Sequence, residues 1–193
     1  AAARRGILIK GGVYLEEARK ISVVALSKTG TITEGKPRLV TTAPAPDLDE
    51  ATLLRLAATL ERGSEHPLAA AIVGGARERG IMLGQAERFE SVTGQGVTGW
   101  VDDHRIALGN RTLLQALNVD PGALEDEAER LRADGQTVMF VVVDGRIAGL
   151  LGVADPIKPT TPDAIRALHA EGLHIVMLTG DSETTARAVA RKL

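Results

Sequence analysis

The sequence predicts an α/β protein in which a smaller α+β unit is inserted between the two parts of a parallel-sheet unit. Three observations support this fold class. An apolar run, Val23–Leu26, ends abruptly in the polar segment Ser27–Thr33, as a buried strand that delivers a loop does. Residues 155–193 alternate helix, strand and helix patterns, which is typical of a βαβ unit. The residues between these parts show short alternating segments with hairpin turns instead.

Composition excludes several classes of protein. The chain has 193 residues, 44% hydrophobic and 25% charged, which suits one large or two small domains with proper cores. Its 23 Lys and Arg nearly balance its 25 Asp and Glu, so no broad electrostatic footprint for nucleic acid exists. The longest apolar run, Val138–Val143, is far shorter than the roughly 18 residues of a membrane helix, so the fragment is expected to be soluble. Because the chain starts at Ala1 and stops at Leu193 within a helical pattern, we expect a piece of a longer protein.

The other elements follow in order along the chain. A Pro-rich stretch, Pro37–Glu50, indicates a connection between units, and Pro67 and Ser64 favour a helix start near residue 67. The pattern predicts helices at Glu50–Glu61, Pro67–Arg79, Arg111–Leu117, Pro121–Ala133, Thr161–Glu171 and Ser182–Leu193. It predicts antiparallel hairpins over Glu87–Leu108 and at Thr137–Val143 with Arg146–Val153, and a strand at His174–Leu178. The expected domains are residues 1–40, 41–148 and 149–193, the first and last forming one domain.

Two loops at strand ends match in chemistry. Ser27–Thr31 follows the first predicted strand, and Thr179–Asp181 follows the last one. In parallel-type strands both loops meet at one sheet edge, where hydroxyls and backbone amides bind phosphoryl oxygens and a lysine or aspartate supplies charge or holds Mg²⁺. The alternative is a pair of ordinary turns. Finding both loops together favours a phosphate site.

The residues also resemble a known family. Lys28–Thr33 after an apolar strand resembles the phosphorylation signature of P-type ATPases, which in that family begins with aspartate. Asp155-Pro156 with Lys158 and then Met177–Asp181 resemble the family's next two motifs, in its order. The resemblance assigns phosphoryl-transfer positions to these residues: Ser27, Lys28, Thr29, Thr31, Lys158, Thr179, Gly180 and Asp181. It implies an incomplete haloacid-dehalogenase-like (Rossmann-like) phosphorylation domain carrying an inserted α+β nucleotide-binding domain, an antiparallel sheet flanked by helices.

Further motifs resemble the heavy-metal-transporting class of this family. Ser64–Leu68 is similar to its nucleotide-domain signature, and Gly6–Gly12 resembles the segment that leaves a membrane helix. The resemblance implies that ATP is bound by Glu61, His66, Gly94, Gly96, Gly109 and Asn110. Taken alone, His66 also suits a helix cap, and Gly109-Asn110 suits a turn. Gly94–Gly99 spells G-x-G-x-x-G, but we reject a dinucleotide-binding fingerprint because a hairpin pattern follows it rather than a helix.

Ser27 departs from the family pattern. It stands where the family's phosphorylated aspartate is expected, and a serine hydroxyl without a nearby base is a poor nucleophile and supplies no anionic ligand for Mg²⁺. The family's later Gly-Asp-Gly-x-Asn-Asp loop would lie beyond Leu193, so the Mg²⁺ site is expected to be incomplete, with the Thr29 carbonyl as a weak remaining ligand. Covalent turnover is expected to fail.

The resemblance therefore implies the ATP-binding headpiece of a heavy-metal pump, on the cytoplasmic side of a membrane-embedded parent, with the parent's membrane and actuator domains as partners. Glu61–Lys158 looks closest to copper(I) pumps, whereas Gly11–Glu17 is also similar to zinc, cadmium and lead pumps. Two alternatives from other classes remain open. One is a soluble haloacid-dehalogenase-like phosphatase, and the other is a nucleotide-binding module without catalysis.

Overall fold

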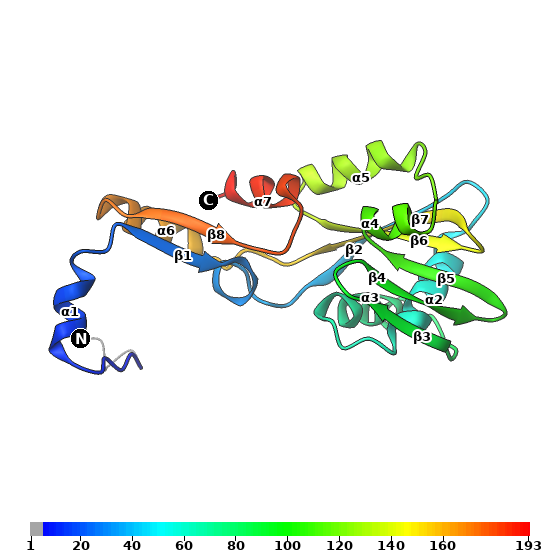
Figure 1. Ribbon diagram of the computed structural model, residues 1–193, viewed down its shortest axis with the longest axis horizontal. Helices are drawn as coiled ribbons and strands as arrows, with labels where there is room; N and C mark the ends of the chain where they lie inside the picture. The colour runs from blue at the N-terminus through cyan, green and yellow to red at the C-terminus, as the bar shows by residue number, and fades with distance from the viewer. Residues whose placement is uncertain (1–5) are drawn as a thin grey trace.

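The computed structural model describes residues 6–193 and contains two sheets in separate parts of the molecule (Figure 1). The larger sheet has the strand order β2-β7-β6-β5-β4-β3 and is antiparallel throughout. The smaller sheet pairs β1 with β8 in parallel. Sequence patterns thus predicted the α/β class with an inserted antiparallel α+β unit correctly, because strand alternation and turn chemistry differ between the two parts.

The six-stranded sheet and its helices form the larger unit. Its strands are β2 (Arg38–Pro44), β3 (Glu87–Val92), β4 (Gly96–Val101), β5 (His104–Gly109), β6 (Thr137–Val143) and β7 (Arg146–Ala154). Its helices are α2 (Glu50–Glu61), α3 (Pro67–Glu78), α4 (Arg111–Ala116) and α5 (Leu124–Ala133). The Asp144-Gly145 turn closes the β6–β7 hairpin with positive φ at both residues, which is the geometry that two-residue hairpin turns require.

Helices cover both faces of this sheet. Met139 and Val141 of β6 point to the core shared with α2 and α3, and Val138, Phe140 and Val142 point to the core shared with α4 and α5. Because successive strand residues face opposite sides, a strand buried on both faces reads as a continuous apolar run. This explains why residues 138–143 are uninterrupted hydrophobic residues in a strand of antiparallel pairing.

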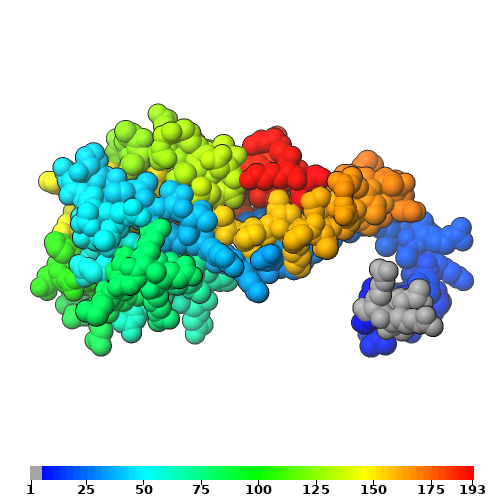
Figure 2. Space-filling view, turned by 180° about the vertical axis from the view of Figure 1, so that it is seen from behind, coloured from blue at the N-terminus to red at the C-terminus, as the bar shows by residue number. Residues whose placement is uncertain are grey.

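The smaller unit consists of β1 (Val23–Ser27), β8 (His174–Leu178) and two helices, α6 (Thr161–Ala170) and α7 (Glu183–Ala190). Helix α6 lies against β8, whereas α7 packs against α5 of the larger unit. Helix α1 (Gly12–Ala18) has no buried residue and projects away from both units (Figure 2), and a short helical turn, η2 (Lys28–Ile32), follows β1. Val23 of β1 and Leu178 of β8 are exposed large apolar side chains, so one face of the small sheet is open.

Some expectations need correction. The Pro-rich stretch at residues 37–50 is not merely a connection, because β2 forms within it and pairs with β7. Proline is tolerated there since β2 is an edge strand. Ser64 does not cap α3; His66 is its N-cap, with Nδ1 accepting from the Leu68 amide at 3.2 Å. The large sheet runs from residue 38 to 154, across the expected limits at 40/41 and 148/149, and the exact domain limits stay a prediction.

Within residues 6–193, every helix is too short or too polar to cross a bilayer. The longest helices, α2 and α3, have 12 residues each and belong to the core of the larger unit.

Gly149 of β7 provides a test of the sheet's packing. It has a φ of +155°, and a Cβ there would lie 2.5 Å from the Ala43 carbonyl oxygen and 2.6 Å from Leu53 Cδ2. We expect Gly149→Ala to lower the free energy of unfolding by about 3 kcal/mol, through backbone strain and overpacking. As a control, Gly74→Ala in α3 meets no atom within 4 Å and should raise stability by about 0.5–1 kcal/mol. Urea unfolding measures both, and equal effects would contradict the packing argument.

Candidate functional site

The loop after β1 begins with Ser27, the position at which the sequence predicts a missing carboxylate. The Ser27 hydroxyl is exposed and donates only a long hydrogen bond, 3.5 Å, to the Thr29 carbonyl. Gly30, with a φ of +78°, turns the chain within Lys28–Ile32, and its amide donates to Thr33 Oγ1 at 3.3 Å. The Thr33 amide closes the loop on the Lys28 carbonyl at 3.0 Å. The loop is therefore a closed turn directly at the end of the strand.

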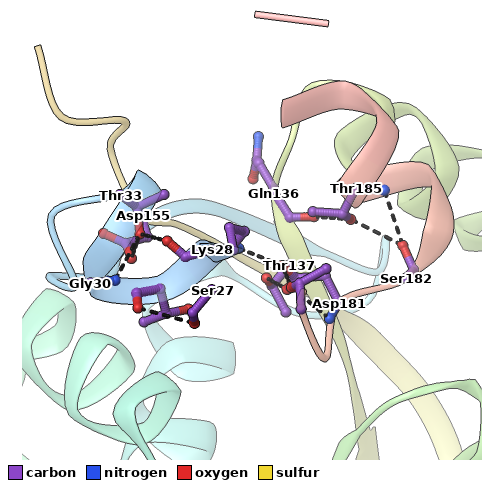
Figure 3. A network of polar contacts seen from close by, with 12 residues as sticks. Ser27, Lys28, Gly30, Thr33, Gln136, Thr137, Asp155, Asp181, Ser182 and Thr185 are labelled. Atoms are coloured by element: carbon purple, nitrogen blue, oxygen red, sulfur yellow. Dashed lines mark hydrogen bonds and ion pairs between the residues drawn. The ribbon is translucent and has the colours of Figure 1, made fainter. Parts of the chain in front are cut away.

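The segment after β7 holds this loop in place (Figure 3). Asp155 accepts from the Thr33 hydroxyl and, at 3.0 Å, from the Lys36 amide. The Lys158 ammonium donates to the Gly30 carbonyl at 2.6 Å. Thr161, a buried residue at the start of α6, donates to the Ile32 carbonyl at 2.8 Å. The structure thus brings together the first two predicted motifs, which are more than 120 residues apart in sequence.

Lys28 and Asp181 form a buried ion pair that joins the third motif to the first. Lys28 is 6% exposed, so it is not a solubilising surface lysine. Asp181 Oδ2 also accepts from Thr179 Oγ1 at 2.7 Å, and Oδ1 accepts from Thr137 Oγ1 at 2.7 Å. Burial alone would raise the pKa of the Asp181 carboxyl, but hydrogen bonds from Lys28, Thr137 and Thr179 outweigh it and lower the pKa below its ordinary value. Asp181 is therefore held ionised at neutral pH.

Thr31 and Gly180 lie within the two loops, and within residues 6–193 the Thr31 hydroxyl makes no hydrogen bond. Gly180 has no atom within 4 Å of the position that a Cβ would take, and the chain is exposed there. Thr137 and Thr161, in contrast, bond directly to these loops and were not among the predicted site residues. A threonine at the start of a strand or helix is too ordinary in sequence to indicate a tertiary contact.

The carboxylates near Ser27 are poorly suited to bind Mg²⁺. Oxygens of Asp181 are engaged by Lys28, Thr137 and Thr179, and those of Asp155 by Thr33 and Lys36. The Thr29 carbonyl, the predicted weak ligand, accepts from Ser27. Across the described part of the chain, no group of three or more His, Asp and Glu is arranged to hold a metal ion. Because Mg²⁺ needs near-octahedral oxygen coordination, and Asp181 is already ion-paired with Lys28 while residue 27 carries no carboxylate, the donor set does not fit this ion.

A second candidate region lies at the end of α2. A cavity of about 460 Å³ opens there, next to the first three turns of α3. It is lined by Glu61, Arg62, Ser64, Ala69, Ala70, Val73, Gly74 and Arg77. Glu61 is only 5% exposed, and its Oε2 atom has no hydrogen-bond partner. Burial raises the pKa of this carboxyl to about 6. An unpaired buried acceptor beside a cavity suits a ligand that carries an N–H or O–H donor.

The predicted glycine positions form a compact group on neighbouring strands. Gly96 of β4 and Gly109 of β5 are direct partners, and a Cβ on Gly96 would lie 2.1 Å from the Leu108 carbonyl oxygen. Asn110 caps α4 and donates through Nδ2 to the Gly94 carbonyl at 2.8 Å. These residues therefore lie together, and Gly96 and Gly109 allow two backbones to approach where side chains would clash. The G-x-G-x-x-G string lies in the β3–β4 hairpin, so rejection of a dinucleotide-binding fingerprint is confirmed.

The loop that carries His66 lies beside this hairpin. Leu60 is in contact range of Gly99 in β4, and Gly63 is in contact range of the Phe89 ring in β3. Within residues 6–193, no hydrogen bond or ion pair joins Glu61 or His66 to the glycine group. The structure thus places the two halves of the predicted nucleotide site on adjacent elements, without direct polar contact between them.

The fold and these loops define a class of protein. The model of the haloacid dehalogenase-like hydrolases matches residues 21–193, so the chain belongs to that family. Over 191 residues it is 55% identical to a copper-transporting P-type ATPase of Rhizobium leguminosarum bv. viciae and 49% identical to a copper-exporting P-type ATPase of Legionella pneumophila subsp. pneumophila. These matches cover 99% of this chain but 23% and 26% of the relatives, so the chain spans about a quarter of their length.

Solved structures agree with this similarity. A zinc-transporting PIB-type ATPase in an E2.Pi state is 37% identical with a TM-score of 0.73, over 100% of this chain and 31% of that one. The catalytic CPx-ATPase domain CopB-B is 26% identical with a TM-score of 0.69, over 99% of this chain and 65% of that one. The resemblance to heavy-metal P-type ATPases, drawn from the motifs, is thereby confirmed.

Glu61 provides a test of the buried carboxyl. Its pKa is higher in the folded chain than the ordinary 4.5, so its contribution to stability is present below pH 4.5 and lost as pH rises through about 6. A glutamine side chain cannot ionise. We therefore expect the free energy of unfolding of Glu61→Gln, relative to that of the unsubstituted chain, to rise by about 1–2 kcal/mol from pH 4.5 to pH 8. Urea unfolding at the two pH values measures this gain. Glu78→Gln, at an exposed position of α3, is the control, and an equal pH dependence in both variants would refute the burial argument.

Proposed function

We propose that this chain is the ATP-binding cytoplasmic headpiece of a heavy-metal cation-translocating P-type ATPase, with copper(I) as the favoured ion. The observation that carries the proposal is the assembly of three motifs around one strand end. Lys28, Lys158 and Asp181 meet at the loop after β1, although they come from both ends of the chain. Relatives named as copper transporters or exporters, which match nearly all of this chain, support the choice of ion.

The larger unit is proposed to bind ATP. The cavity at the end of α2 offers an unpaired carboxylate oxygen of Glu61, and the nearby β3–β5 hairpins offer exposed backbone at Gly94. The N-domain of HMA6, described as a copper-transporting P-type ATPase, matches 62% of this chain at 25% identity with a TM-score of 0.52. This match favours a nucleotide-binding domain, rather than the cap domain of a soluble phosphatase, as the interpretation of the larger unit. The membrane and actuator domains of the parent pump are the proposed partners.

Ser27 is proposed to make the phosphotransfer site inactive. Among residues 6–193, its hydroxyl has one hydrogen-bond partner, the Thr29 carbonyl, which is not a base. Deprotonation of serine at neutral pH needs such a base. The neighbouring Lys28 cannot act as that base, because its ammonium group forms an ion pair with Asp181. The arrangement retains the loop that orients a phosphoryl group but lacks the carboxylate that would accept it.

A zinc, cadmium or lead pump is the second candidate. The zinc-transporting structure aligns over the whole chain at 37% identity. Ion choice depends on side chains inside the membrane, which these residues do not include. The headpiece architecture is therefore compatible with each of these ions.

Titration of the chain with ATP, followed by amide NMR, tests nucleotide binding. We expect shifts at Gly94, Gly96 and Asn110, and we expect His66→Asn to weaken binding about tenfold by removing a ring that can stack on the purine. Asparagine is chosen because it retains an N-cap for α3. Arg166→Ala, on the exposed surface of α6, is the matched control. Unchanged affinity of the His66→Asn variant would remove His66 from the site.

Restoring the carboxylate tests the inactive phosphotransfer site. We expect Ser27→Asp to yield no stable phosphoenzyme with γ-labelled ATP and Mg²⁺, because the carboxylates around the loop are already paired and Mg²⁺ keeps too few protein ligands. Acid-quenched gels measure the label. Labelled protein in the Ser27→Asp sample, but not in a Ser27→Asn control, would show that one carboxylate suffices.

A further inference from the structure

Helix α7 and the residues on either side of it contact α5 and the segment that leads from α5 into β6 (Figures 1 and 3). Thr185, which is 1% exposed, donates to the Gln136 carbonyl at 2.9 Å. Lys192 donates to the Asp134 carbonyl at 2.9 Å, and Thr184 donates to Glu129 at 3.2 Å. These contacts join the small unit to the large one, in addition to the two chain segments that connect the units before β2 and after β7.

One contact of this junction reaches the phosphotransfer loop itself. Thr137 Oγ1 donates to Asp181 Oδ1 at 2.7 Å, while Oδ2 of the same carboxylate accepts from Thr179 and pairs with Lys28. Thr137 is the first residue of β6, which is paired along its length with β7. Its position is therefore set by the six-stranded sheet, whereas Asp181 lies in a loop that has no strand partner.

We propose that Thr137 is a positioning residue: it holds the Asp181 carboxylate toward Lys28 and so couples the orientation of the six-stranded unit to the loop that begins at Ser27. The proposal rests on the proposed function, because it gives the ATP-binding unit a direct contact with the phosphotransfer loop. Neither the motifs nor the names of the relatives indicate this contact.

The geometry explains why the coupling acts in both directions. If the large unit turns away from α7, Asp181 Oδ1 loses its hydrogen bond from Thr137 inside a nearly buried site, whereas Oδ2 keeps Thr179 and Lys28. Lys28 then loses a fixed counter-charge next to the acceptor position. Conversely, any group that draws Lys28 away from Asp181 weakens the hydrogen bond between Thr137 and Asp181, since energetic coupling between sites is reciprocal.

A simple packing role makes a different prediction. In that case Thr137 would matter only because it helps α7 lie on α5, and loss of any hydrogen bond at this junction would have the same effect. Thr184 offers the comparison, because its hydroxyl bonds to Glu129 at the same junction without touching Asp181.

The experiment uses Thr137→Val, which removes the hydroxyl at nearly constant volume, with Thr137→Ser as the rescue variant. Side-chain ¹⁵N NMR detects the Lys28 ammonium when it is held in a buried ion pair, and Lys28→Arg assigns the signal. A pair of spin labels at Glu78→Cys and Glu171→Cys measures the distance between the two units, which is convenient because the chain has no cysteine. All spectra are recorded without nucleotide.

We expect Thr137→Val to abolish the Lys28 ammonium signal and broaden the distance distribution, while Thr137→Ser restores both and Thr184→Val retains the Lys28 signal. An unchanged Lys28 signal in Thr137→Val, or its equal loss in Thr184→Val, would overturn the proposal. If Thr137→Val fails to fold, Thr137→Ala removes the same hydroxyl without touching the ion pair, and an unchanged Lys28 signal in that variant would equally overturn the proposal. Failure of ATP binding would contradict the proposed function alone, because none of these readouts needs ATP.

Discussion

The buried ion pair between Lys28 and Asp181 connects segments that lie at opposite ends of the chain, and the small unit depends on it. A two-stranded parallel sheet such as β1 with β8 is marginal by itself, so contacts at its carboxyl end have a large share in fixing it. Hydrogen bonds from Thr137 and Thr179 satisfy the remaining acceptors of the carboxylate. Removal of either charge would leave the other uncompensated in a nearly buried site, which is far more destabilising than replacing both.

The large unit shows the opposite arrangement, in which one oxygen of a buried carboxyl lacks a partner. Glu61 ends α2 in a core of leucines and alanines, and its Oε2 atom has no donor in the described structure. A residue of this kind lowers stability at neutral pH, and such residues concentrate at functional sites. The glycine pair Gly96 and Gly109 adds a second constraint, since no side chain fits between the strands there. The buried Glu61 carboxyl, which suits a ligand with a hydrogen-bond donor, thus lowers the stability of the large unit at neutral pH.

Local signals in the sequence predicted most of the elements. The bounds of α2 and β8 are those expected, and the Asp144-Gly145 turn defined the β6–β7 hairpin, because caps, periodicity and turn residues act over short ranges. The motifs also predicted which loops meet at the β1 strand end. Other features depend on distant contacts. β2 forms in a Pro-rich stretch because β7 offers it an edge, and Thr137 enters the site only through the packing of α7 on α5. No local pattern carries that information.

The proposed nucleotide site and the proposed phosphotransfer site use different elements of this chain. Ser27 ends β1 of the small sheet, whereas Glu61 ends α2, His66 caps α3, and Gly96 and Gly109 lie in β4 and β5 of the six-stranded unit. A hydroxyl at residue 27 carries one charge fewer than a carboxylate would, and the hydrogen bond that the Ser27 side chain makes goes to Thr29 within its own loop. The Lys28–Asp181 pair and the Lys158 contact with Gly30 do not involve the Ser27 side chain, so the loop keeps its shape without an acceptor. The proposed loss of phosphotransfer therefore concerns only the side chain at residue 27, and the loop contacts of Lys28 and Lys158 do not depend on it.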